Sequence, residues 1–243
     1  MSAGSRKRRE PKLGVTWFGH SAFLLESPAG TRVLVDPWLE NPKAPAGAAA
    51  IDRVDVILVT HGHSDHVGQT VPVAKRTGAK VVCIYELALH LGGRGVEGVT
   101  GMNKGGTLAV GGVSVTMTDA KHSADIDADG TVVPGGEAAG FVIRFENGYS
   151  VYHSGDTCAF LDMKLIQKLH RPSLAILPIG GLYTMDPREA ALACRMLTPR
   201  KIIGMHYGTF PALAGTPAEL RKHLPGKMRE SVLELVPGVR RDI

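Results

Sequence analysis

Short apolar runs separated by Gly and Pro residues recur along the chain, a pattern that predicts β-strands. In the first half these runs are residues 13–18, 22–26, 32–35, 56–59 and 80–84. In the second half they are residues 107–110, 113–118, 140–145, 149–152, 173–177, 201–205 and 232–235. Asn147-Gly148, between two of these runs, is a dipeptide typical of a tight hairpin turn. The chain is therefore expected to be rich in short strands.

Helical spacing of apolar residues appears between the strands and becomes more frequent toward the end of the chain. Helices are expected at residues 67–77, 86–91, 160–170, 187–197 and 217–223. The segment 160–170 places on one helical face the residues Leu161, Leu165, Ile166 and Leu169. Asp186 is the expected N-cap of the helix 187–197. Two mostly β halves with interspersed helices predict an α/β protein, in which two sheets pack together with helices outside.

The chain has 243 residues, which suits one large domain or two small ones, and 44% of them are hydrophobic, enough for a substantial core. No apolar run approaches the roughly 20 residues that span a bilayer. The three cysteines, Cys83, Cys158 and Cys194, form no CxxC pair, which argues against a disulfide framework and favours a reducing compartment. No apolar stretch of the signal-peptide kind follows the basic first residues. A cytoplasmic location is therefore expected, with no membrane association.

The formal net charge of +5 is concentrated at the N-terminus. Residues 1–12 contain five Lys or Arg and one Glu, so they carry +4 and leave about +1 for all the rest. A basic segment before a nearly neutral chain is more typical of a disordered tail than of a nucleic-acid-binding face. Residues 1–12 are therefore expected to form such a tail, and nucleic acid is not an expected partner.

Four potential metal ligands lie close together directly after the apolar run 56–59: His61, His63, Asp65 and His66. A strand that ends in a tight turn would bring these side chains to the edge of a sheet, where imidazoles and a carboxylate can converge on a cation. Packing does not require three histidines and an aspartate at this spacing, so a metal site is preferred over a polar surface turn.

Three further polar residues follow later predicted strands, and these are His122, Asp156 and His206. Loops at strand ends often carry the chemistry of a rigid scaffold. Taken alone, each of the three could be an ordinary surface or turn residue. Their order behind the first cluster is what makes them candidate ligands.

This order, HxHxDH followed by His, Asp and His, resembles the metallo-β-lactamase superfamily over almost the whole chain. It is similar in particular to a branch of uncharacterised metal-dependent hydrolases related to the ascorbate-phosphate lactonases. The residues that carry the closer resemblance include Trp17-Phe18-Gly19-His20-Ser21-Ala22-Phe23, Val35-Asp36-Pro37-Trp38, Gly101-Met102-Asn103-Lys104-Gly105-Gly106, Tyr152-His153-Ser154-Gly155-Asp156-Thr157 and His206-Tyr207-Gly208-Thr209-Phe210-Pro211. The resemblance implies a four-layer αββα sandwich, formed as one domain by residues 13–243, with the site at one edge of the paired sheets.

The resemblance also implies a complete ligand set for two divalent metal ions. One ion would be held by His61, His63 and His122, and the other by Asp65, His66 and His206, with Asp156 bridging the two. Zinc is the first expectation, and manganese, iron and nickel are alternatives, because His/Asp sites of this kind accept all four. A hydroxide shared by the two ions would be the nucleophile.

Two catalytic residues are expected. Asp65 would orient the hydroxide and transfer its proton, and His20 would contact the substrate or leaving group, unless it is a hydrogen-bonded structural histidine. Asp36, His153 and Tyr207 are expected behind the ligands or against the substrate. Asp36 would fix a ligand imidazole, and a structural role for His153 is the alternative.

The leading interpretation is a metal-dependent hydrolase that opens an ester, lactone, amide or phosphodiester bond of a small, anionic molecule. A phosphodiesterase or nuclease is an alternative, although the nearly neutral domain shows no basic patch with interleaved aromatic residues. A non-catalytic metal-binding protein is the second alternative, and it would be favoured if a ligand were missing. The sequence does not specify the substrate or the oligomeric state.

Overall fold

Two seven-stranded sheets form the centre of the protein in the computed structural model, which describes residues 13–128 and 130–243. The expected basic tail, residues 1–12, lies outside the described residues. The first sheet has the order β16-β1-β2-β3-β4-β5-β6. Its strands are β16 (Arg241–Asp242), β1 (Gly14–Trp17), β2 (Phe23–Glu26), β3 (Arg32–Val35), β4 (Val56–Leu58), β5 (Lys80–Ile84) and β6 (Val99–Met102). It is antiparallel from β16 to β3 and parallel from β3 to β6.

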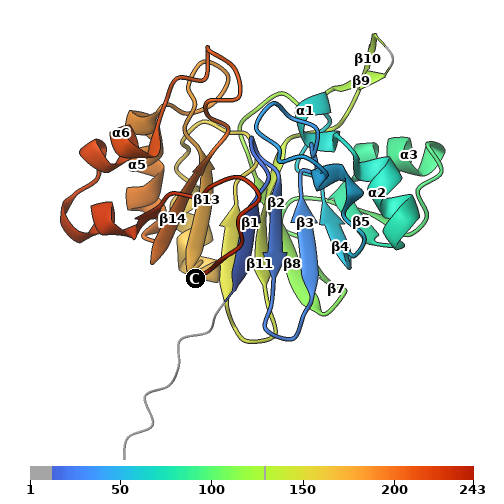
Figure 1. Cartoon of the computed structure of the whole chain (residues 1–243), viewed down its shortest axis with the longest axis horizontal. Coiled ribbons are helices and arrows are strands. Elements are labelled where there is room, and N and C mark those ends of the chain that lie inside the picture. Colours follow the sequence, from blue (N-terminus) through green and yellow to red (C-terminus); the bar gives the residue numbers. More distant parts are fainter. Residues whose placement is uncertain (1–12, 129) are drawn as a thin grey trace, which may run out of the picture.

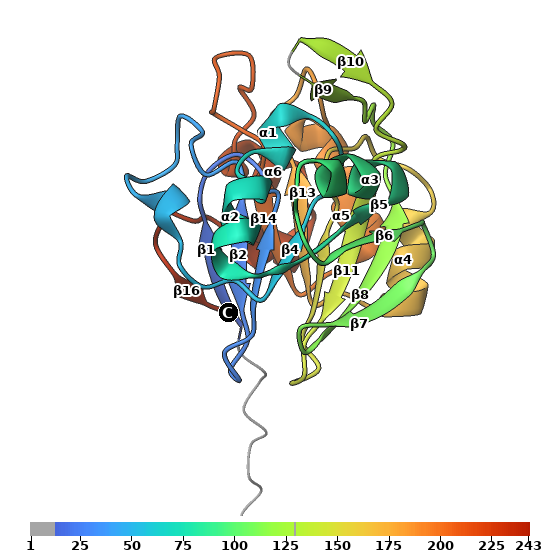
Figure 2. The same ribbon diagram turned by 90° about the vertical axis from the view of Figure 1, so that its right-hand side faces the viewer.

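The second sheet repeats this mixed arrangement, with the order β15-β14-β13-β12-β11-β8-β7. Its strands are β15 (Val232–Leu233), β14 (Lys201–Met205), β13 (Leu174–Pro178), β12 (Ser150–His153), β11 (Ala139–Arg144), β8 (Val113–Asp119) and β7 (Thr107–Val110). The strands from β12 to β15 are parallel, and those from β7 to β12 are antiparallel. A separate hairpin of β9 (Ile126–Ala128) and β10 (Thr131–Val133) projects beyond the end of the sandwich, above α1 and α3 (Figure 1 and Figure 2).

Helices cover the outer face of each sheet. The first sheet carries α1 (Ser64–Val67), α2 (Thr70–Thr77) and α3 (Tyr85–Gly93), and the second carries α4 (Met163–His170), α5 (Pro187–Leu197) and α6 (Pro217–His223). Figure 1 shows α2 and α3 on one side of the paired sheets and α5 and α6 on the other. The four layers are therefore helices, sheet, sheet and helices, which confirms the expected αββα sandwich.

The central strands of the second sheet, β11 to β14, are buried on both faces. In β13, Leu174 and Ile176 belong to the core between the sheets, whereas Ala175 and Leu177 pack with α5 residues such as Ala190. Side chains alternate between the two faces of a strand, so a strand covered on both sides reads as a continuous apolar run. This explains why the short apolar runs located these strands in the sequence.

The expected helix 67–77 is interrupted near its start. The chain forms α1, breaks at Gly68 and Gln69, and resumes as α2. Gly68 has a φ of +39°, and a Cβ atom there would lie 2.4 Å from the Cα atom of Trp38. The close approach of the loop that contains Trp38 therefore requires glycine and ends α1.

The predicted buried face of the helix 160–170 is wrong. The helix begins only at Met163, and Met163 and Ile166 are its buried residues. Large parts of Leu161, Leu165 and Leu169 are exposed. Met163 and Ile166 pack against Tyr152 and Val142 of the second sheet, so the stripe that faces the core lies beside the stripe of leucines.

Candidate metal centre

The candidate ligands lie in loops at one end of the sandwich. His61, His63, Asp65 and His66 follow β4, His122 follows β8, Asp156 follows β12, and His206 follows β14. These are the loops at the upper end of the sandwich in Figure 1. Gly62 lets the β4 loop pass closely beneath the β9–β10 hairpin, because a Cβ atom at Gly62 would be 2.5 Å from the carbonyl oxygen of Ala124.

Two groups of ligand atoms converge in this region. In one group the ligand atoms of His61, His63 and His122 lie within 4.8 Å of one another. In the other group the same limit holds for His20, Asp65, His66 and His206. The sequence predicted both groups except for His20, which it placed against the substrate.

Asp156 lies between the two groups. Its Oδ2 atom is 3.2 Å from Nε2 of His66, 3.0 Å from Nε2 of His206 and 3.7 Å from Nε2 of His122. The side chain is almost completely buried. The structure thus brings all seven predicted ligands together, with Asp156 in contact with members of both groups.

The donor set fits divalent cations. Within the described part of the chain, Oδ1 of Asp156 is buried and makes no hydrogen bond. A buried polar atom without a partner is costly unless something else satisfies it. Imidazole nitrogens and a carboxylate directed at a common point are the ligands that zinc, manganese, iron and nickel accept.

Electrostatic interactions keep the carboxylates of the cluster ionised. Burial opposes ionisation of Asp156, but His66 and His206 outweigh it and hold the pKa of Asp156 well below its usual value. Burial likewise disfavours a charge on His66, yet Asp156 and Asp36 raise the pKa of His66 well above its usual value. In the metal-free protein the buried negative charge is therefore balanced by protonated imidazole.

Asp36 supports the loop that carries the ligands. Its carboxylate accepts hydrogen bonds from the backbone N–H of Thr60 at 2.8 Å, from the Thr60 hydroxyl at 2.8 Å and from Nδ1 of His66 at 2.8 Å. Asp36 is fully buried. The bond to Nδ1 leaves Nε2 of His66 directed at Asp156, so Asp36 fixes the orientation of this imidazole.

His20 is fully buried and contacts Asp65. Its Nε2 is 3.0 Å from Oδ2 of Asp65, and its Nδ1 is 2.9 Å from the hydroxyl of Thr209. Burial lowers the pKa of His20 to about 4, although the hydrogen bond with Asp65 acts in the opposite direction. A neutral His20 donates a hydrogen bond from Nε2 to the Asp65 carboxylate and accepts one from the Thr209 hydroxyl at Nδ1. The geometry therefore places His20 behind Asp65, on its buried side, and His20 is not among the residues that line the cleft.

The other two supporting residues lie away from the ligands. His153 is buried, with Nε2 at 3.2 Å from the carbonyl oxygen of Ser21 and Nδ1 accepting the N–H of Gly155 at 3.2 Å. The ring of Tyr207 stacks on Trp17 with 5.2 Å between centroids. Both residues hold the loops next to Asp156 and His206, and these contacts favour the structural alternative for His153.

Three residues of the site have a left-handed backbone. The φ angles are +50° at His20, +47° at Asp36 and +54° at His206. Residues with a side chain rarely adopt this region, and such strain is concentrated at functional sites. The backbone N–H of His206 donates to the carbonyl oxygen of His20 at 3.0 Å, which links two of the strained turns. No residue pattern predicted this backbone geometry.

An open cleft of about 300 Å³ leads to the cluster. It is lined by His63, Asp65, His122, Ser123, Asp156, Tyr183 and His206. Tyr183, which the sequence did not identify as a site residue, lies in the loop between β13 and α5. Its place in the cleft depends on how that loop folds over the strand end.

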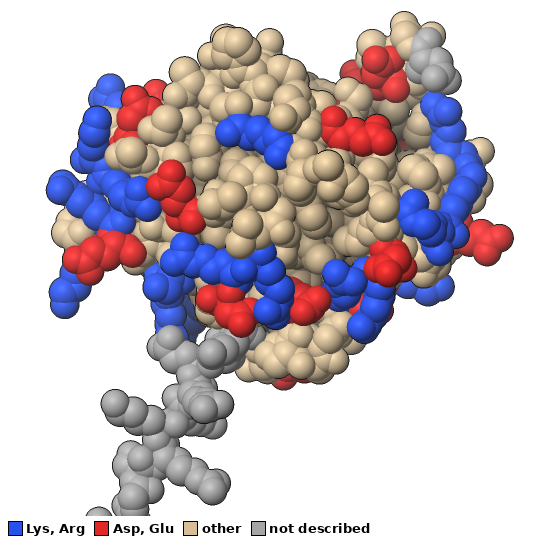
Figure 3. Space-filling view, in the orientation of Figure 1, with Lys and Arg blue, Asp and Glu red and all other residues tan. Residues whose placement is uncertain are grey.

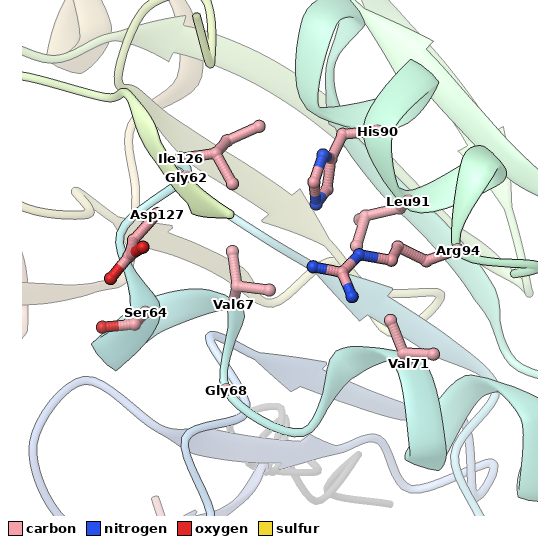
Figure 4. A pocket seen from close by; sticks show the side chains of 10 residues that line it. All are labelled: Gly62, Ser64, Val67, Gly68, Val71, His90, Leu91, Arg94, Ile126 and Asp127. Atoms are coloured by element: carbon pink, nitrogen blue, oxygen red, sulfur yellow. The ribbon is translucent and has the colours of Figure 1, made fainter. Parts of the chain in front are cut away.

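A second cavity of about 400 Å³ lies on the other side of the ligand loop, between α1, α3 and β9. Gly62 and Ser64 form part of its wall, and His90, Arg94 and Asp127 contribute polar groups (Figure 4). None of the seven candidate ligands lines this cavity. Elsewhere, Cys83 and Cys194 are buried free thiols, whereas Cys158 is an exposed one. No helix among residues 13–128 and 130–243 is long and apolar enough to cross a membrane.

Comparison with known proteins agrees with this architecture. The profile of the beta-lactamase superfamily domain matches residues 14–206. The UPF0173 metal-dependent hydrolase of Koribacter versatilis is 52% identical over 211 residues, which cover 86% of this chain and 91% of that protein. The corresponding hydrolase of Solibacter usitatus is 49% identical over 225 residues and covers 92% and 97% of the two chains.

A solved structure is also similar over nearly the full length. Igni18, a metallo hydrolase from the archaeon Ignicoccus hospitalis, superposes with a TM-score of 0.85 at 34% identity, covering 96% of this chain and 98% of Igni18. The matching profile, the relatives of about half-identical sequence and the shared sandwich lead to one conclusion. The chain belongs to the metallo-β-lactamase superfamily and is a metal-dependent hydrolase of the UPF0173 type.

Proposed function

We propose that this hydrolase holds two divalent ions, zinc in the first place, and opens an ester, lactone, amide or phosphodiester bond of a small molecule. The observation that carries the proposal is the pair of ligand groups that meet at Asp156. His61, His63 and His122 would hold one ion, and Asp65, His66 and His206 the other. Ions bound there would supply a water molecule of lowered pKa and polarise the bond to be broken.

Asp65 is the residue best placed to act on the attacking water. It lines the cleft, and 30% of its side chain is exposed, whereas Asp156 is almost fully buried. Burial opposes ionisation of Asp65, but the hydrogen bond with His20 and the nearby imidazoles of His206 and His66 outweigh it and hold the pKa of Asp65 far below its usual value. An ionised Asp65, fixed from behind by His20, accepts a hydrogen bond from the water and orients it toward the substrate.

The lining of the cleft favours a small molecule over a nucleic acid. The described residues that line the cleft include no Lys or Arg. On the face shown in Figure 3, the end of the sandwich that carries the site is occupied mainly by uncharged residues. Nucleic-acid binding depends on Lys and Arg that contact phosphates, so the phosphodiesterase or nuclease alternative has less support.

The proposal is tested by metal analysis and a substrate panel. Inductively coupled plasma mass spectrometry of the purified chain is expected to find about two divalent ions per molecule. The chain is also expected to hydrolyse at least one compound of a series of esters, lactones, amides and phosphodiesters. Removal of the ions by a chelator should abolish that activity, and added zinc or manganese should restore it. Failure of the metal-loaded protein on the whole series would instead support the non-catalytic alternative.

A further inference from the structure

Tyr183 gives the cleft a large aromatic wall. The other residues that line the cleft are the candidate ligands and Ser123, all of them polar or ionisable. Tyr183 is 62% exposed, and its neighbour Leu182 is 71% exposed. Tyr183 therefore presents apolar surface to the cleft beside the polar metal centre. Leu182 is not among the residues that line the cleft, but it precedes Tyr183 in the same exposed loop.

The loop that carries these side chains is held firmly at its base. The backbone N–H of Gly181 donates to the carbonyl oxygen of Met185 at 3.0 Å. The backbone N–H of Met185 donates to the carbonyl oxygen of Thr157 at 3.3 Å. Met185 is fully buried, and Thr157 directly follows Asp156. The tip of the loop is thus fixed relative to the bridging carboxylate, and Leu182 and Tyr183 project from it.

The conformation of Leu182 does not serve packing. Its φ of +58° lies in the left-handed region, where glycine or asparagine is preferred and leucine is strained. A strained leucine would be expected to bury its side chain in return, but this side chain is mostly exposed. Exposed apolar surface next to a concave polar site is typical of ligand binding.

We infer that Leu182 and Tyr183 bind an apolar group of the substrate next to the bond that is hydrolysed. The substrate therefore carries an aromatic ring or a branched alkyl group next to that bond, as in a carboxylic ester or lactone whose acyl part bears such a group. Hydrolysis breaks the acyl C–O bond, the oxygen of water joins the acid, and a proton goes to the leaving alcohol. The inference rests on the proposed function, because the metal centre beside the loop must hold the reacting carbonyl group.

The test measures binding of hydroxamic acids to the metal-loaded protein by calorimetry. Acetohydroxamic acid reports on the metal centre alone, since it has only a methyl group besides its chelating atoms. Phenylacetohydroxamic acid adds one ring that would contact Leu182 and Tyr183. We expect the phenyl compound to bind at least about tenfold more tightly, as burial of a few carbon atoms in an apolar site allows.

Variants separate the two side chains from the rest of the surface. Tyr183→Ala and Leu182→Gly should each reduce the ratio of the two affinities to about threefold or less, whereas Tyr183→Phe should keep it, because the ring and not the hydroxyl makes the contact. Leu165→Ala, on the exposed face of α4, is the matched control and should leave the ratio unchanged.

The outcomes distinguish this inference from the proposed function. Absence of acetohydroxamate binding would contradict the metal centre itself. Binding of acetohydroxamate without any advantage for the phenyl compound, or an advantage that survives both Tyr183→Ala and Leu182→Gly, would overturn the apolar subsite. Loss of the affinity advantage of the phenyl compound in Tyr183→Phe would show that the hydroxyl of Tyr183, and not its ring, makes the contact.

Discussion

The side chain of Asp65 is more exposed to solvent than that of Asp156. It lines the cleft with 30% of its side chain exposed, and His20 holds it from the buried side. We expect Asp65→Asn to lower kcat at least about 100-fold, because the amide cannot accept a proton as the carboxylate does. The metal content should fall much less, since the other ligands and the shape of the site remain. Steady-state kinetics and metal analysis on the same preparation check this, and equal loss of both would make Asp65 a ligand only.

Asp36 should show the opposite balance between affinity and rate. In Asp36→Asn the amide group replaces one of the oxygens that accept from Thr60 and His66. Outer partners of ligands typically contribute about 10–100-fold to metal affinity. We expect a loss of this size in zinc affinity, with kcat recovering at saturating zinc. Competition with a fluorescent chelator gives the affinity, and a kcat that stays low in excess zinc would contradict a purely supporting role.

At this scale the sequence predicted which residues meet but not how each is oriented. The spacing HxHxDH identifies His61, His63, Asp65 and His66, because nothing in ordinary packing requires it. The position of His20 depends on a contact across 45 residues of sequence and on the turn between β1 and β2. The fold of the loop between β13 and α5, which is not set by local spacing, brings Tyr183 into the cleft.

Helix α4 shows that apolar spacing alone does not determine the buried face of an element. Ile166→Ala should cost about 2–5 kcal/mol of unfolding free energy, because it leaves a cavity against the second sheet. Leu165→Ala removes an exposed side chain and should change the unfolding free energy by no more than about 0.5 kcal/mol. Urea unfolding of both variants measures the difference. Similar losses of unfolding free energy in Ile166→Ala and Leu165→Ala would show that both side chains are buried, as expected for one apolar helical face.

The elements that the sequence located well share strong local signals. The strands 32–35, 80–84, 107–110 and 201–205 and the helices 187–197 and 217–223 have the predicted bounds. Asp186 is the N-cap of α5, as predicted, and accepts the N–H of Glu189 at 2.7 Å. The strands β6, β9, β10 and β16 were not predicted. β9 and β10 form a short hairpin with each other, whereas β16 depends on β1, a neighbour distant in sequence.

For the whole molecule, bound metal should contribute to stability without being needed for the fold. The core between the sheets is built from apolar residues of both sheets, away from the ligand loops. At a free metal concentration about 1,000-fold above Kd, one site adds about 4 kcal/mol, which corresponds to a rise in Tm of about 8–16 °C for a chain of this size.

Thermal unfolding of the chelated and metal-loaded protein measures this effect. The far-ultraviolet circular dichroism spectrum of the chelated protein should stay close to that of the loaded form at 25 °C. An unfolded spectrum after chelation would show that the fold itself depends on metal. An unchanged Tm would show that the site does not bind metal strongly in solution.

The left-handed turns at His20, Asp36 and His206 limit how this enzyme can be made more stable. Glycine at any of the three would relieve about 1–2 kcal/mol of backbone strain, but it would also remove a side chain of the metal centre. Natural drift and directed evolution for heat resistance would therefore have to gain stability elsewhere. A stabilised variant that acquired glycine at one of these positions would keep the αββα fold but lose catalytic activity. At these three turns, selection for thermal stability and selection for catalysis therefore oppose each other.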